Sequence, residues 1–255
     1  MVKIPQFDSV TLPDGAEQLR ADVRAFIREE VSEGSIASWS GADVSYRPDF
    51  SKKVAERGWI GMMLPKKYGG HEKTALDRYI VSEELLAAGA PLSFHWVADR
   101  QSGPLILNHG TEKQREEILP KIAAGELCFC IGMSEPNSGS DLASIETNAD
   151  KVDGGWRVNG TKLWTSFAHK AHYMIALVGT EPKGENRHAG MSQFLIDLTL
   201  PGIEIRPIKN LAGREDFNEV VFRDCIVPED MMVGKEGNGS SQVTSELGYE
   251  RSGPE

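Results

Sequence analysis

Residues 128–166 read CFCIGMSEPNSGSDLASIETNADKVDGGWRVNGTKLWTS, and they mark the point where the pattern of the chain changes. The stretch opens with an apolar, strand-like run that ends in the polar turn 134–141. Gly139 allows a positive φ in this turn and a close approach of the backbone to a ligand. A second strand-like segment carries Trp164 and Ser166. Two neighbouring strands end in residues with hydroxyl groups and an indole. This pattern predicts that they form one side of a binding site for a flat heterocycle with polar edges.

Upstream of this stretch, apolar residues recur at the spacing of amphipathic helices. Thr111 and Gln114 form one of the capping-box patterns that predict where these helices begin. We expect a break at 103–104, where Gly is followed by Pro, and a kink or a division into two pieces at Pro120. Residues 1–126 are therefore predicted to form an all-α domain.

From Leu127 the apolar period changes from about 3.6 to 2. Eight short strand candidates follow, and we expect hairpin-type turns at 153–155 and at 159–160. This pattern predicts a small antiparallel β-barrel or sandwich over residues 127–237. Helical spacing then returns, so residues 238–255 are predicted to begin a third, helical domain. The fold class is α+β.

Composition narrows the classes of function. The chain has 255 residues and a formal net charge of −10, which argues against a nucleic-acid-binding surface. No apolar run is long enough to span a membrane. The first residues, MVKIPQFDSVTLPDG, lack the apolar region of a secretory signal, so we expect a cytoplasmic protein.

The three cysteines, an odd number, are typical of a reducing compartment. Cys128 and Cys130 alternate along a strand and would face the same side, which leaves a metal or redox pair as a minor alternative. His169 and His172 do not combine with any cysteine at the spacing of a zinc site, so no metal is expected.

Taken singly, the features of the opening stretch are more typical of a Ser/Gly-rich surface loop and a core tryptophan. The ordered string of 134–136, 139–141 and 164–166 instead resembles the acyl-CoA dehydrogenase flavoproteins, whose middle domain opens with a Thr/Ser-Glu-Pro…Gly-Ser-Asp turn and continues to a Trp-x-Thr/Ser strand. The resemblance extends from about Asp14 to the last residues. Relatives continue into a second helical domain, so we expect a truncated protein or an unusual short form.

The resemblance implies an FAD site. It places Met133 and Ser134 along the flavin ring, and Trp164 and Ser166 beside it, with the Ser166 hydroxyl near the reactive nitrogen. Serine stands at both positions where the family commonly has threonine, so each hydroxyl is retained and a methyl group is lost.

The same resemblance implies residues for the substrate. Gly139 and Ser140 match the turn that approaches the ligand, and Ser140 is also a candidate contact for the acyl-CoA. Glu250 matches the position from which a minority of the family takes its catalytic base, and Arg251 matches an arginine near the site. A Glu-Arg pair is also common on helix surfaces, so a surface role stays open. Gly248 stands where the family often has a CoA-binding aspartate, which puts that contact in doubt.

The implied activity is α,β-desaturation of an acyl-CoA thioester in fatty-acid or lipid metabolism, as in β-oxidation. Electrons would pass to an electron-transfer flavoprotein, and the chain would form a dimer or tetramer with itself or with a homologous subunit. The alternatives are a non-catalytic subunit or truncated partner-binding remnant, and an oxidase or flavin monooxygenase on the same fold. The acyl group cannot be read from the sequence.

Overall fold

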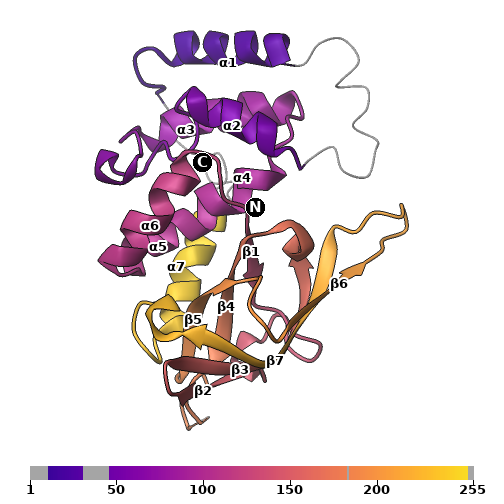
Figure 1. The fold of residues 1–255 in the computed structure, drawn as a ribbon. Helices are drawn as coiled ribbons and strands as arrows, with labels where there is room; N and C mark the ends of the chain where they lie inside the picture. Colours follow the sequence, from indigo (N-terminus) through magenta and orange to yellow (C-terminus); the bar gives the residue numbers. More distant parts are fainter. Residues whose placement is uncertain (1–10, 31–45, 183, 252–255) are drawn as a thin grey trace, which may run out of the picture.

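The computed structural model describes residues 11–30, 46–182 and 184–251, and the side chains of Glu250 and Arg251 lie outside this description. A helical domain is joined to a β-domain, and the last helix runs alongside both (Figure 1). The helical segments before the sheet are α1 (Ala16–Glu30), α2 (Pro48–Glu56), η1 (Lys66–Tyr68), α3 (Ala75–Ala87), α4 (Ser93–Val97), η2 (Ala98–Ser102), α5 (Gly103–His109) and α6 (Glu112–Ala123).

Local capping fixes the starts of two of these helices. At α6, the Thr111 hydroxyl accepts the Gln114 N–H at 3.2 Å, and the Gln114 side chain accepts the Thr111 N–H at 3.0 Å, which confirms the predicted capping box. Thr74 and Asp77 make the same reciprocal pair at α3. α6 runs through Pro120 without dividing into two helices.

The break predicted at Gly103-Pro104 is wrong. α4, η2 and α5 follow one another without a gap, and η2 is a π-helical turn. A Cβ at Gly103 would lie 2.9 Å from the carbonyl oxygen of Ala98, which accepts the Gly103 N–H in this π turn, so the turn favours glycine here. Such π turns often occur at functional sites, because one extra residue changes the direction in which the following side chains point.

The β-domain is one eight-stranded sheet. Its order is β6-β7-β3-β2-β4-β5-β8, and β1 pairs with β4 off this path. Most neighbours are antiparallel, but β1 and β4 are parallel, and one residue pair joins β2 and β4 in parallel. The fold class is as predicted, whereas the sheet is mixed and does not close into a barrel. The strands are β1 (Phe129–Gly132), β2 (Asn148–Val152), β3 (Gly155–Ser166), β4 (Tyr173–Gly179), β5 (Met191–Asp197), β6 (Ile203–Ile208), β7 (Phe217–Pro228) and β8 (Met232–Val233), with short helical turns η3 (Leu142–Ser144), η4 (Ala168–Lys170) and η5 (Glu229–Met231).

Strand β3 is longer and less regular than the sequence predicts. The hairpin at Asp153-Gly154 is present between β2 and β3, but the turn predicted at 159–160 is wrong, because Gly160 lies inside β3. Gly160 has φ +143°, and a Cβ there would lie 2.4 Å from Thr147 Oγ1. A second register shift separates Lys162 from Thr165. β3 therefore bends twice, next to the site described below.

The two domains share a hydrophobic core. Ile118, Leu119 and Ile122 of α6 pack in one cluster with Phe129 of β1 and Leu195 of β5. The last helix, α7 (Gly239–Arg251), packs against η2, α5 and β5, and Figure 1 shows it running from the sheet towards the helical domain. Side chains from both domains and from α7 therefore meet in one region.

Candidate active site

The turn after β1 is fixed to β3 by the backbone. The N–H of Leu163 donates to the carbonyl oxygen of Ser134 at 2.8 Å. Glu135 and Ser138 close the turn through reciprocal backbone hydrogen bonds of 2.6 and 3.2 Å. These bonds hold Met133 and Ser134 beside the irregular part of β3.

Trp164 is exposed where a core tryptophan would be buried. Its side chain is 57% exposed and its φ is +60°, in the second irregular region of β3. A positive φ at a large side chain costs about 1–3 kcal/mol and is usually found where function needs it. The indole meets the Phe217 ring edge to face, with the centroids 6.2 Å apart. The bulge therefore presents a flat aromatic surface to solvent instead of adding it to the core.

A cavity of about 280 Å³, here called the interdomain cavity, lies next to this tryptophan. The helical domain contributes an indole and an amide to its wall, and the sheet contributes apolar side chains and a hydroxyl. Its lining residues are Trp96, Val97, Gln101, Cys130, Ile131, Met133, Trp164, Ser166, Glu246 and Leu247.

The structure brings together three of the six residues predicted for the flavin, since Met133, Trp164 and Ser166 all line this cavity. Ser134 follows Met133 in the same turn but is not a lining residue. Gly139 and Ser140 are exposed and do not line the cavity. Their contacts with a ligand, and the contact of Ser134, stay predictions.

The predicted acid–base residues lie at the end of α7. The backbone of Glu250 and Arg251 is helical, but their side chains fall outside the described part of the structure. Their roles as catalytic base and substrate contact therefore stay predictions as well.

Sequence reasoning missed Trp96 and Glu246 as residues of this cavity. Glu246 is 2% exposed, and one of its carboxylate oxygens accepts a hydrogen bond of 2.7 Å from the side-chain amide of Gln193. A signal was present in the sequence, because Glu246 lies three residues after the buried Val243 and so on the same side of the helix. The guanidinium of Arg100 lies 4.3 Å from the centroid of the Trp96 ring, which holds this indole at the cavity wall.

A buried ion pair lies beneath the turn. Lys162 Nζ is 2.7 Å from Glu135 Oε1, and the two side chains are 0% and 4% exposed. Burial lowers the pKa of Lys162 to about 8, although the nearby carboxylate opposes this shift. Burial alone would raise the pKa of Glu135, but Lys162 and the N–H of Glu146 outweigh it and hold this pKa below its ordinary value. Both groups are therefore charged at neutral pH.

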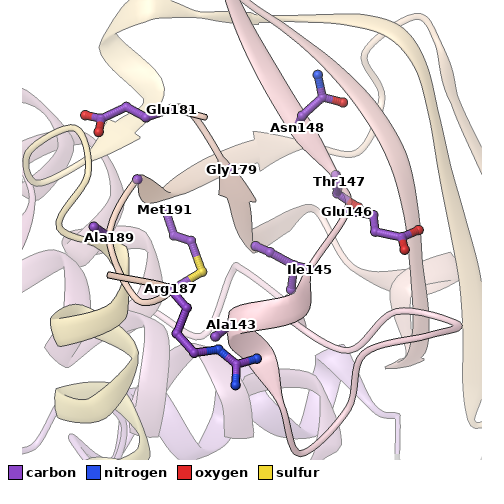
Figure 2. A pocket seen from close by; sticks show the side chains of 11 residues that line it. Ala143, Ile145, Glu146, Thr147, Asn148, Gly179, Glu181, Arg187, Ala189 and Met191 are labelled. Atoms are coloured by element: carbon purple, nitrogen blue, oxygen red, sulfur yellow. The ribbon is translucent and has the colours of Figure 1, made fainter. Parts of the chain in front are cut away.

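A second cavity of about 320 Å³, here called the β-domain cavity, is formed within the β-domain alone. Figure 2 shows its wall from Ala143 to Asn148 on one side, and Arg187 and Met191 on the other. The Arg187 guanidinium pairs with the carboxylate of Asp141 at 2.5 Å, next to the Gly139-Ser140 turn. The hydroxyl oxygen Thr147 Oγ1 is buried without a hydrogen-bond partner.

The cysteines are free and buried. Burial raises the pKa of the Cys128 thiol to about 12, so it is not a reactive thiolate at neutral pH. Within residues 11–30, 46–182 and 184–251, no group of three or more His, Cys, Asp or Glu side chains has the arrangement of a metal site. In the same residues, no helix combines the length and apolarity that crossing a bilayer requires.

Comparison with known proteins gives consistent matches. The model of the acyl-CoA dehydrogenase N-terminal domain matches residues 13–126, and that of the middle domain matches residues 130–225. The chain is 39% identical over 215 residues to acyl-CoA dehydrogenase FadE34 of Mycobacterium tuberculosis, which covers 82% of this chain and 29% of that protein.

Two solved structures extend this similarity. The ChsE4–ChsE5 complex of Mycobacterium tuberculosis has a TM-score of 0.84 at 32% identity, over 95% of this chain and 61% of the matched chain. The Tcur3481–Tcur3483 steroid ACAD has a TM-score of 0.85 at 29% identity, over 94% of this chain and 62% of that chain. The chain thus spans less than two thirds of the length of each of these proteins.

Proposed function

The chain belongs to the acyl-CoA dehydrogenase family, and from this membership we propose that it takes part in the FAD-dependent α,β-desaturation of an acyl-CoA thioester. The family consists of oxidoreductases that are flavoproteins. The observation that carries the proposal is the exposed, bulge-supported indole of Trp164 at a cavity that Met133 and Ser166 also line.

The interdomain cavity fits one face of a flavin ring. Trp164 supplies a flat apolar surface, and the exposed Ser166 lies two residues further along the same strand with a hydroxyl that can donate or accept a hydrogen bond. The strained backbone at Trp164 keeps its indole out of the β-domain core, where it would otherwise gain burial energy. An aromatic side chain that is kept exposed despite backbone strain and lost burial is typical of a binding site.

We infer that Met133, Ser134, Trp164 and Ser166 hold the flavin, with Gly139 and Ser140 approaching it from the turn. When bound, the flavin supplies the chemistry of hydride acceptance from the β-carbon of the acyl group. Trp164 would lie beside the ring and exclude water from it, and the Ser166 hydroxyl would donate a hydrogen bond to it.

The proton must leave the α-carbon of the thioester, and a carboxylate of the chain is the natural base. We propose Glu250 for this role, with Arg251 near the substrate. A base works best when its pKa approaches the working pH, and desolvation inside a closed site raises the pKa of a carboxylate in that direction. Hydrogen bonds to the thioester carbonyl would stabilise the negative charge that develops there.

We place the acyl-CoA along Ser140, next to Asp141 and the β-domain cavity. The electrons would pass on to an electron-transfer flavoprotein. Acyl groups of several classes are to be tested, and a polycyclic one is among them because one structural relative is a steroid ACAD.

The test is the visible spectrum of the purified full chain, before and after addition of acyl-CoA thioesters with straight, branched or polycyclic acyl groups without oxygen. Absorption in the blue that bleaches with one of these substrates supports the proposal. A colourless chain contradicts flavin binding. A coloured chain that consumes oxygen together with acyl-CoA favours an oxidase or monooxygenase.

The base is tested separately with Glu250→Gln, which keeps the shape of the side chain and removes its basicity. We expect bleaching to slow by about 10²–10⁴-fold while flavin content is retained. Glu246→Gln, one helical turn earlier, tests the other carboxylate of α7, which lines the cavity, and Glu236→Gln, at an exposed position, is the matched control. Unchanged bleaching in Glu250→Gln would refute the assignment, and a loss only in Glu246→Gln would move the role to that residue.

A second candidate is a subunit without catalytic activity of its own. It is favoured by the similarity to the ChsE4–ChsE5 complex, of which the chain covers 61% of one subunit. We would purify the chain with and without a homologous acyl-CoA dehydrogenase chain and compare the flavin content. Flavin that appears only in the mixed assembly supports this candidate, and full flavin content in the chain alone contradicts it.

A further inference from the structure

Lys162 connects β3 to the wall of the interdomain cavity. Its ammonium group donates to the carbonyl oxygen of Met133 at 3.2 Å and to Glu135 at 2.7 Å. Its aliphatic part passes Gly132, where a Cβ would lie 3.3 Å from Lys162 Cγ. Trp164 follows two residues later on the same strand. One side chain therefore holds Met133 at a fixed position relative to the strand that carries the indole.

Glu135 makes the connection to the other cavity. Its Oε2 accepts the backbone N–H of Glu146 at 2.6 Å, and its two oxygens lie 3.2 and 3.3 Å from the backbone nitrogen of Thr147. Glu146 and Thr147 both line the β-domain cavity, as Figure 2 shows. The carbonyl oxygen of Thr147 in turn accepts the N–H of Gly179, another lining residue.

A purely structural role is a poor explanation for this pair. The free energy needed to remove two charges from water offsets much of the attraction between them. An apolar pair of similar size would often make the protein equally or more stable. Here the charged side chains bind backbone groups of two cavity walls, Met133 in one and Glu146 and Thr147 in the other.

We propose that Glu135 and Lys162 are positioning residues, whose ion pair joins the wall of the interdomain cavity at Met133 to the wall of the β-domain cavity at Glu146 and Thr147. The consequence for flavin binding rests on the proposed function, whereas the coupling of the two walls does not. Losing either partner loosens both walls together, although residues 146 and 147 do not line the interdomain cavity.

The first experiment is amide hydrogen exchange on the full chain without added ligand, in the wild type and in Lys162→Met. We expect the protection of the Glu146 and Thr147 amides to fall at least tenfold more than that of Ala176, which lies in the core strand β4. The control is Lys151→Met, which removes the exposed ion pair with Glu229 on the same sheet and should leave the Glu146 and Thr147 amides unchanged. An equal loss at all these amides, or no loss, would overturn the proposal.

Lys162→Met leaves a buried carboxylate without its cation, so this variant can fail to fold. The double variant Glu135→Gln with Lys162→Met carries no charge at the site of this pair and should fold. We expect it still to exchange faster at Glu146 and Thr147, because a neutral amide accepts these N–H groups less strongly than a carboxylate. Wild-type protection in a folded double variant would overturn the proposal.

The second experiment titrates FAD into the same variants and follows the visible spectrum. Lys162→Met and the double variant should bind flavin at least tenfold more weakly, with the Lys151→Met control unchanged. A wild-type chain that binds no flavin refutes the proposed function, and hydrogen exchange then still decides the coupling of the walls. A wild type that binds, with variants that bind equally well, overturns the positioning role alone.

Discussion

The two walls of the interdomain cavity are built in opposite ways. The helical wall, from α4 through η2 to α5, is a continuous run of backbone hydrogen bonds with a single π turn. The β wall combines a tryptophan at positive φ, two register shifts and a fully buried lysine. The helical wall is held within one continuous stretch of sequence, whereas the β wall is held by residues distant in sequence. The residues proposed to hold the flavin are concentrated on the wall whose shape depends on distant residues.

The largest effect on the free energy of unfolding is expected where Gly160 of β3 packs closely against Thr147. Gly160→Ala should lower the free energy of unfolding by about 4 kcal/mol, because it adds a Cβ at 2.4 Å from Thr147 Oγ1 and fixes an unfavourable φ. Gly154→Ala in the hairpin is the control, since its φ is also positive but a Cβ there meets nothing within 4 Å. It should cost only about 1 kcal/mol. Equal losses in urea denaturation would show that β3 is less constrained than its contacts indicate.

His95 in the helical wall is a buried group that is sensitive to acid. His95 of α4 is 5% exposed and bonds to Ser51 Oγ at 2.7 Å, and burial lowers its pKa to about 4. The unfolded chain takes up this proton near pH 6.5 and the folded chain only near 4. The contribution of neutral His95 to the free energy of unfolding is therefore complete above pH 6.5. It is lost as the pH falls towards 4, by about 3 kcal/mol in total.

His95→Asn should remove this part of the acid dependence in urea denaturation at a series of pH values between 7 and 4. The control His188→Asn, at an exposed position, should leave the acid dependence unchanged. If the two variants behave alike, His95 is not the source of the acid sensitivity.

A smaller effect is expected for the indole that faces the cavity. Trp164→Ala should weaken flavin binding about tenfold, because it removes the flat surface against the ring. Ile226→Ala on β7 removes another exposed apolar side chain, 45% exposed and away from the lining residues, and should bind flavin normally. Unaltered flavin titration in Trp164→Ala would show that the bulge does not serve the cofactor.

The smallest effect on stability tests the local rules that start two helices of the helical domain, α6 and α3. Thr111→Ala removes the capping box of α6 and should cost about 1 kcal/mol of unfolding free energy. Thr74→Ala at α3 removes the same motif and should cost a similar amount. A loss well above this value at only one of the two helices, measured by urea denaturation, would mean that its start also depends on distant contacts.

Features that depend on near neighbours were predictable from the sequence. The capping box of Thr111 and the hairpin at 153–154 were predicted, because both need only residues within a few positions. The domain limits at residues 126 and 237 stay predictions. Trp164 could be placed at a site only through the resemblance to a family, since propensity alone favours a core aromatic there.

Features that depend on distant partners were not predictable in this way. The pattern at 159–160 is typical of a hairpin turn, but Gly160 is required because Thr147 crosses it closely. The partner of Lys162 is 27 residues away, and no helical or strand spacing connects the two. Glu246 reaches the cavity only because α7 packs against β5 and η2.

The parallel pairing of β1 has a consequence for the order in which the molecule is made. Phe129 follows the helical domain directly in sequence, yet its partner across the sheet is Tyr173. A chain growing on the ribosome therefore completes the helices of its helical domain while the apolar strand β1 that follows them still lacks its partner β4. Until residues 173–176 emerge, this strand has unsatisfied backbone groups, and closing so long a loop is slow compared with helix formation. The nascent protein is thus most open to capture by a chaperone in this interval.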